Sequence, residues 1–107
     1  MLRYGLKIRV GFTIRKRTMP VIKRVVLDVL KPHQPNALEF ASALAERHSG
    51  CHITVTVIEV DEKTETTMLA IESEDVPYDA IVASIGSLGA SVHSIDEVEV
   101  CSERAET

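Results

Sequence analysis

Residues 21–32 read VIKRVVLDVLKP, a run rich in β-branched and other apolar residues. In an extended chain, successive side chains point to opposite faces. Val25 and Leu27 therefore share one face, while Val26 and Leu30 share the other. Because both faces are apolar, this run predicts a central strand of a sheet.

The residues after this strand predict a helix. Pro32 and Pro35 prevent regular strand pairing from continuing. Asn36 is a suitable N-cap, and Glu39, three residues later, completes a capping box. The spacing of apolar residues predicts a helix over 37–48. Its expected inner stripe comprises Leu38, Ala41, Leu44 and Ala45.

The rest of the chain repeats these two patterns. Residues 52–60 alternate as in a half-buried strand, residues 61–64 form a polar turn, and residues 66–73 return as the second strand of a hairpin. Residues 76–88 carry apolar side chains at three- and four-residue spacing, which predicts a second helix. Residues 90–100 predict the last strand.

This order of elements predicts an α+β domain of the ferredoxin-like βαββαβ type. Two β-α-β units with right-handed crossovers, joined by a shared hairpin, give that topology. The expected sheet is antiparallel and four-stranded, in the order 4-1-3-2, with both helices on one face. The other face stays open. Since the first strand is apolar on both faces, we expect the open face to associate with other molecules and the protein to be a homo-oligomer.

Charge divides the chain into a basic segment and an acidic body. Residues 1–18 hold six of the twelve Lys and Arg residues and none of the sixteen Asp and Glu residues. We expect this basic arm to lie outside the fold, as a non-native upstream start, a leftover of cloning or a flexible arm. We expect residues 19–101 to form the domain and residues 102–107 to be a polar tail. An acidic body would repel a phosphate backbone, so no nucleic-acid partner is expected.

The sequence also bears on the compartment. No apolar run approaches the ~20 residues that a membrane span needs, so no membrane partner is expected. Cys51 and Cys101 form neither a CxxC pair nor a metal-binding spacing, which suits a reducing compartment. We expect a cytoplasmic protein with two free thiols.

Three stretches resemble an archaeal protein family. They are residues 25–35 (VVLDVLKPHQP), the strand motif 53–55 with residues 59–61 after it, and residues 93–98 (HSIDEV). The family is domain of unknown function 211, and the resemblance covers about residues 20–100. It implies a ferredoxin-like fold, an archaeal cytoplasmic source and homo-oligomers, with no established biochemical activity.

The topology predicts a polar cluster where the first strand ends and the last begins. Its candidate ligand-binding residues are Asp28, Lys31, His33 and His93. Imidazole nitrogen and carboxylate oxygen suit a divalent transition metal, whereas Lys31 and the helix N-terminus near Asn36 suit an anionic or amino-acid-like ligand. The alternative is structural: His33 would cap a turn, and His93 would pair with Asp28.

The acidic hairpin turn is a second candidate. Asp61 and Glu62, with Glu65 nearby, could supply oxygen ligands to calcium or magnesium. The spacing matches no EF-hand loop, so a solvated acidic turn is the alternative. With Asp28, His33 and His93 added, these residues are the candidate ligands for a divalent cation, namely calcium, magnesium or zinc.

The chemistry visible in the sequence favours binding over catalysis. It contains no nucleophile beside a base, no phosphate loop and no complete metal-ligand set. We therefore expect a homo-oligomeric binding or regulatory protein whose assembly is tuned by a small ligand or a divalent cation. The alternative is a structural or partner-binding module that uses the open sheet face.

Overall fold

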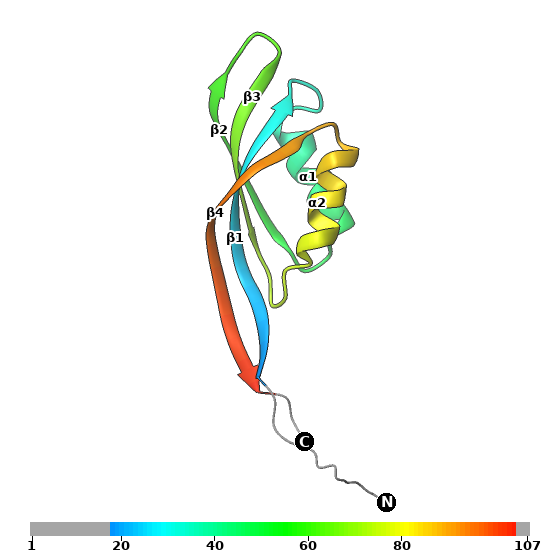
Figure 1. The fold of residues 1–107 in the computed structure, drawn as a ribbon. Coiled ribbons are helices and arrows are strands. Elements are labelled where there is room, and N and C mark those ends of the chain that lie inside the picture. The colour runs from blue at the N-terminus through cyan, green and yellow to red at the C-terminus, as the bar shows by residue number, and fades with distance from the viewer. Residues whose placement is uncertain (1–17, 105–107) are drawn as a thin grey trace, which may run out of the picture.

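The chain alternates strands and helices in the predicted order. The computed structural model describes residues 18–104. Its elements are β1 (Thr18–Pro32), α1 (Ala37–Arg47), β2 (His52–Val60), β3 (Thr64–Glu72), α2 (Tyr78–Ser87) and β4 (Ser91–Arg104) (Figure 1). Apart from Thr18, the predicted basic arm lies outside the described residues. β4 continues into the predicted polar tail as far as Arg104.

The four strands form one antiparallel sheet in the order β2-β3-β1-β4. This is the predicted order 4-1-3-2 read from the other edge, and both helices lie on one face (Figure 1). The sheet is not equally wide along its length. β3 pairs with β1 only from Arg24 to Pro32, whereas β4 pairs with β1 from Thr18 onward. β1 and β4 therefore continue as a two-stranded ribbon beyond the other strands (Figure 1).

The core lies between the helices and the sheet. Val25, Leu27 and Val29 of β1 are at most 2% exposed and belong to the same buried cluster. Val26 is 4% exposed although its side chain alternates to the opposite face. The prediction of a central strand with two apolar faces is thus confirmed. The other strand and helix residues of the core include Phe40, Leu44, Leu69, Ile71, Ile81 and Ile85.

Helix α1 begins as predicted but buries a different stripe. Asn36 accepts a hydrogen bond from the Glu39 backbone, and the Glu39 side chain accepts one from the Asn36 backbone, forming the capping box. Phe40 and Leu44, four residues apart, fill the core. Leu38 is 76% exposed, so the predicted inner stripe is wrong at that position. At 3.6 residues per turn, Leu38 lies almost opposite Phe40 on the helix. Ala45 is exposed as well.

The pairing between β1 and β4 is interrupted by three register shifts. Two of them are bulges in which β4 has one residue more than β1. The extra residues of β4 are His93 and Asp96, neither of which has a partner on β1. Bulges of this kind twist a strand and redirect the side chain of the extra residue. Both irregular positions of β4 thus carry a polar side chain from the predicted family motif.

Candidate functional site

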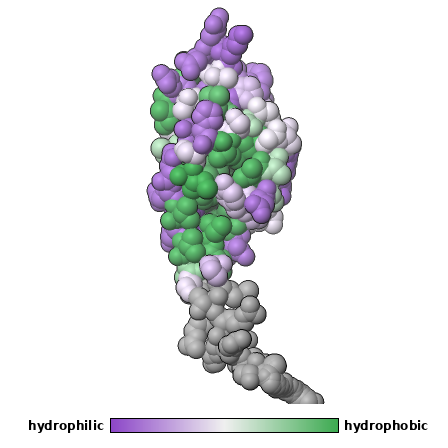
Figure 2. Space-filling model, in the orientation of Figure 1, coloured by the Kyte–Doolittle hydropathy of each residue, from purple (hydrophilic) through white to green (hydrophobic). Residues whose placement is uncertain are grey.

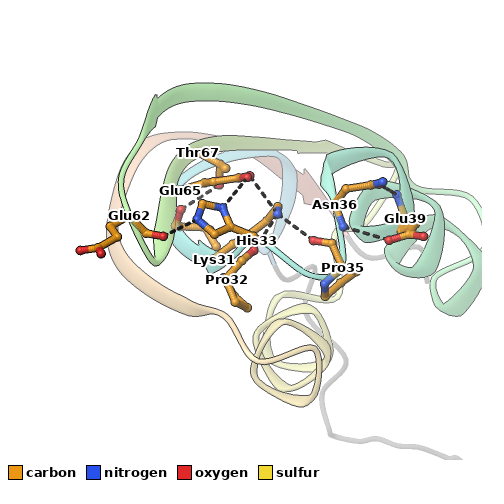
Figure 3. Close-up of polar contacts among 10 residues, drawn as sticks. Lys31, Pro32, His33, Pro35, Asn36, Glu39, Glu62, Glu65 and Thr67 are labelled. Carbon is orange, nitrogen blue, oxygen red and sulfur yellow. Dashed lines mark hydrogen bonds and ion pairs between the residues drawn. The ribbon is translucent and has the colours of Figure 1, made fainter.

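A buried lysine organises the loop that follows β1 (Figure 3). The Lys31 side chain is 0% exposed. Its Nζ donates to the carbonyl oxygens of Pro32 at 2.8 Å and Pro35 at 2.7 Å, and lies 3.0 Å from Glu65 Oε1. An ammonium group has three hydrogens, so these three acceptors satisfy it completely. Lys31 therefore ties the loop to β3 and has no donor left for a ligand.

His33 extends the same cluster toward the hairpin. Its Nδ1 lies 3.0 Å from Glu65 Oε2, and its Nε2 lies 3.0 Å from the Glu62 carbonyl oxygen. An ionised carboxylate and a carbonyl can only accept, so both ring nitrogens must carry hydrogens for both bonds to form. The arrangement is complete only with a cationic imidazolium.

The charges in this cluster support one another. The hydrogen bond to Glu65, followed by the one to the Glu62 backbone, raises the pKa of His33 above its ordinary value. The hydrogen bonds from His33 and then from Lys31 lower the pKa of Glu65. One carboxylate thus faces two cations. Such a group joins the β1–α1 loop to the hairpin and is structural in character.

Glu65 is the centre of this cluster, although its place in the sequence indicated only a residue near the acidic turn. The signal that identifies its role is cross-strand register. Lys31 and Glu65 are directly opposite each other in the antiparallel pair of β1 and β3. Opposite charges at such positions attract one another across a sheet. The register can be read from sequence only after the partner strand is aligned.

The four predicted ligand-binding residues do not come together. Lys31 and His33 meet at Glu65, whereas Asp28 lies opposite Met68 and Ser94, on the other face of β1. Side chains at positions 28 and 31 must point to opposite faces because a strand alternates. His93 is exposed in its bulge. Within the described residues, no hydrogen bond or ion pair joins His93 to Asp28, so the alternative pairing is also absent.

The predicted metal ligands are likewise dispersed. Asp61 and Glu62 are exposed in the hairpin turn, where the Glu62 carbonyl is bound to His33. Across residues 18–104, no group of three His, Cys, Asp or Glu side chains is placed to hold a metal ion. Asp28, His33, His93, Asp61 and Glu62 therefore do not form a single coordination site within this subunit.

The open face of the sheet contains a small hollow of about 200 Å³. It is lined by Asp28, Ile58, Thr66, Thr67, Met68 and Asp96. Asp96 reaches it from a bulge of β4 and accepts a hydrogen bond from Ser94 Oγ at 2.7 Å. The hollow combines two carboxylates with two large apolar side chains. Of its residues, Asp28 was a predicted ligand, whereas the bulge that brings in Asp96 was not foreseen.

The open face is otherwise more polar than the sequence predicted. Arg24 of the central strand bridges two neighbouring strands: its guanidinium lies 2.6 Å from Glu72 Oε2 and 3.0 Å from Glu97 Oε2. These two contacts raise the pKa of Arg24 further, the hydrogen bond to Glu72 having the larger effect. The bridge spans β3, β1 and β4 and neutralises part of the acidic charge there.

Exposed apolar side chains lie on both edge strands: Val57, Ile58 and Val60 on β2, and a second group on β4. Ile95, Val98 and Val100 are 50%, 50% and 53% exposed, and we refer to them as the β4 strip. The β1 residues opposite them belong to the core or pack against it. Side chains directly opposite on neighbouring strands share a face, so the strip lies on the helix-side face of the sheet. Figure 2 shows apolar surface along the part of the molecule that β4 occupies. β4 is also an edge strand of the sheet.

In the part of the chain that the structure describes, no helix is both long and apolar enough to cross a membrane.

Comparison with known proteins agrees with the resemblance seen in the sequence. The family called domain of unknown function 211, described as uncharacterized ArCR, matches residues 23–106. The chain is also similar to uncharacterized protein MJ0319 of Methanocaldococcus jannaschii, with 42% identity over 77 residues. That alignment covers 72% of this chain and 79% of the relative. The protein therefore belongs to the domain of unknown function 211 family, whose activity is not established.

Proposed function

We propose that this protein is a cytoplasmic homo-oligomeric binding protein whose assembly is tuned by a small cation held in the open-face hollow. The observation that carries the proposal is that Asp28 and Asp96 both line this hollow. The two residues come from different strands, β1 and β4. Two carboxylates facing one space attract a positive charge that would relieve their repulsion.

The chemistry of the walls favours an organic ammonium ion. Ile58 and Met68 supply apolar surface, while Thr66 adds a hydroxyl group. A hydrocarbon group next to an ammonium head would use both kinds of surface. Calcium takes six to eight oxygen ligands, and magnesium demands octahedral geometry. Two carboxylates from one subunit supply few of these ligands, so a divalent cation would need a second subunit or several waters.

Ligand and assembly are linked through β4. Asp96 lies between Ile95 and Glu97 on the edge strand. A cation bound to Asp96 would hold the bulge in one geometry and thereby order the neighbouring β4 strip. The exposed strip supports self-association, since apolar surface of this kind is characteristic of interaction sites. The two free thiols, Cys51 and Cys101, suit a reducing cytoplasm.

Calorimetry and light scattering test this proposal together. We would titrate the protein with methylammonium and 1,4-diaminobutane, and separately with calcium, magnesium and zinc chloride. Binding of an amine, lost in Asp28→Asn and in Asp96→Asn, is expected. Asp75→Asn is the matched control because Asp75 is exposed and does not line the hollow. Unchanged binding in both hollow variants would exclude this cavity, and binding of a metal but no amine would exclude the ammonium ligand.

The alternative, a partner-binding module that uses the open face, has weaker support. Arg24, Glu72 and Glu97 occupy that face with a bridge whose charges already have partners. Apolar residues exposed there, Ile58 and Met68, line the hollow and do not form a broad patch. Light scattering that shows a monomer at all accessible concentrations would leave this alternative in place of the homo-oligomer.

A further inference from the structure

We propose that residues 6–15 of one copy of the chain add as a fifth strand to the outer edge of β4 in a second copy. The inference rests on the proposed homo-oligomer for its second copy, and it names the contact that would hold the copies together. Addition of a strand to an exposed sheet edge is a common mode of peptide recognition.

The first observation is that β4 has two chemically different faces. The β4 strip makes its helix-side face apolar, and each of these three side chains is half exposed. Glu97 and Glu99 pair in register with Val26 and Arg24, on the open side of the sheet. On its inner side β4 pairs with β1, while its outer side has no strand among residues 18–104. An unpaired edge of this length is a template for another strand.

The second observation is the matching pattern in the basic segment. From residue 6 to residue 15 the chain reads LKIRVGFTIR. Every second residue is large and apolar, and the alternate positions include Lys7, Arg9 and Arg15. Strict alternation over ten residues predicts a half-buried strand. In extended form, residues 6–15 would have one wholly apolar face and one cationic face without any acid. Its apolar residues are Leu6, Ile8, Val10, Phe12 and Ile14.

The two patterns are complementary. Paired with β4, the segment would place its apolar face beside the β4 strip and its cations near Glu99, and near Glu97, whose carboxylate Arg24 already contacts. Opposite charges on neighbouring strands attract one another. At about 3.3 Å per residue the ten residues span roughly 33 Å, which fits within the 14 residues of β4.

A second β4 is a poorer occupant of the same edge. Antiparallel pairing of two β4 strands about Val98 would place Glu97 of one copy opposite Glu99 of the other. Like charges directly opposite on neighbouring strands repel each other. The acidic face of β4 therefore favours a basic strand over a copy of itself.

The reach of the chain favours a segment that comes from a second copy. Thr18 pairs with Arg104 on the inner side of β4. From Thr18 back to Arg15 the chain extends at most about 11 Å. The outer side of β4 lies two strand spacings from β1, about 10 Å, and the chain would also have to pass around the end of β4. A reach of about 11 Å leaves almost nothing for that detour, whereas a neighbour's segment has no such limit.

The experiment uses full-length variants and light scattering. Ile8→Lys with Val10→Lys breaks the apolar face of the segment, and Val98→Lys breaks the β4 strip. Each is expected to shift the oligomer to monomers. The control Thr13→Lys adds one charge on the cationic face, as many as Val98→Lys adds to the β4 strip, and should leave the mass unchanged. Circular dichroism melting checks that each variant is folded.

Mixing the two defective variants tests exchange between copies. The Val98→Lys copy keeps an intact segment, and the Ile8→Lys/Val10→Lys copy keeps an intact β4 edge. A one-way contact should therefore re-form, and the mixture should give a dimer mass. Failure of the mixture to associate would overturn the proposal.

Hydrogen exchange gives a second readout at the edge itself. Outward-pointing β4 amides should exchange about tenfold more slowly in the wild-type protein than in the Ile8→Lys/Val10→Lys variant. Amides of β3 should be unaffected, which separates loss of the contact from unfolding. Protection of the β4 edge in a monomer would show that the segment binds its own subunit and would overturn the exchange.

The outcomes also separate this inference from the proposed function. An oligomer that keeps its mass and its β4 exchange rates in the Ile8→Lys/Val10→Lys variant would overturn the segment contact and leave the homo-oligomer intact. A wild-type protein that is monomeric at all accessible concentrations would overturn both. Whichever of these outcomes is observed, the Asp28 and Asp96 variants test amine binding to the hollow separately.

Discussion

The two ends of β1 differ in how completely their chemical groups are satisfied. At its C-terminal end Lys31 and His33 use all their side-chain donors on the Glu65 carboxylate and on nearby carbonyls. Toward its N-terminal end, β1 pairs with β4, whose outer edge carries no strand among residues 18–104 and whose Val98 and Val100 are half exposed. The first end is closed and stabilises the subunit. The second is open and suits contact with another molecule.

This contrast shows that the polar residues of a sequence motif are not always the residues that remain available to bind another molecule. The histidine and lysine next to two prolines looked like a ligand site, but they hold a loop in place. Apolar residues of β4, which are ordinary in a strand, are among the groups left exposed. Substitutions at the closed end should therefore change stability, and substitutions at the open end should change association.

Removing the carboxylate of the closed end should have the largest effect. Glu65→Ala would leave the buried Lys31 ammonium without its counter-charge, and we expect a loss of about 3 kcal/mol in the free energy of unfolding. Urea denaturation measures this loss. The matched control is Glu74→Ala, because Glu74 is fully exposed beside Lys23 and such surface pairs contribute at most about 1 kcal/mol. Equal effects of the two substitutions would contradict the contrast.

The cap of α1 should contribute less than the buried ion pair. Asn36→Ala removes the side-chain acceptor for the Glu39 backbone amide, which is 2.9 Å away. We expect a loss of about 1 kcal/mol in unfolding free energy. Thermal melting checks this value against Asn36→Asp, which keeps an acceptor oxygen. A cap variant as damaging as Glu65→Ala would show that the loop does not depend mainly on Lys31.

The pH dependence of the closed end follows from its pKa shifts and should be smaller than the effect of Glu65→Ala. The pKa of His33 is raised on folding, so its contribution is fully present below its unfolded value of about 6.5 and is lost as the pH rises through the folded value. The pKa of Glu65 is lowered, so its contribution is lost as the pH falls below about 4.3. The cluster should stabilise most between these two pH values.

Urea midpoints between pH 5.5 and 8.5 would measure this effect in the wild-type protein and in His33→Gln. The wild-type advantage should shrink as the pH rises. A constant difference between the two proteins would mean that His33 is held without its second proton.

The smallest effect on stability is expected at the open end. Val98→Thr keeps the shape of a half-exposed side chain and should change the free energy of unfolding by no more than about 0.5 kcal/mol. Because it places a hydroxyl in the β4 strip, it should lower the oligomer mass measured by light scattering. A large loss of stability in the dilute protein would show that the strip belongs to the core of the subunit.

The sequence predicted the fold well because the relevant signals are local. The alternation of residues 21–32 shows which side chains face together, and Asn36 with Glu39 marks the helix start within one turn. The stripe of α1 was predicted less well. Leu38 is apolar but exposed. The side of the helix that faces the sheet is the one that carries Phe40 and Leu44, which are both buried.

The candidate site was less predictable because it depends on contacts between distant residues. Strand parity alone separates Asp28 from Lys31, and this could have been read from the sequence. The placement of Asp96 could not, since it results from a bulge that exists only in the pairing of β4 with β1. A one-residue irregularity changes which face a side chain joins.

By itself the sequence determined the order of elements, the two apolar faces of β1 and the capped start of α1, because spacing and turn chemistry act over a few residues. The tertiary structure alone decided that Lys31 meets Glu65, that Asp96 joins Asp28, and that the β4 strip stays exposed. Each of these depends on the register between strands far apart in the chain, and on how far the two helices extend over the sheet.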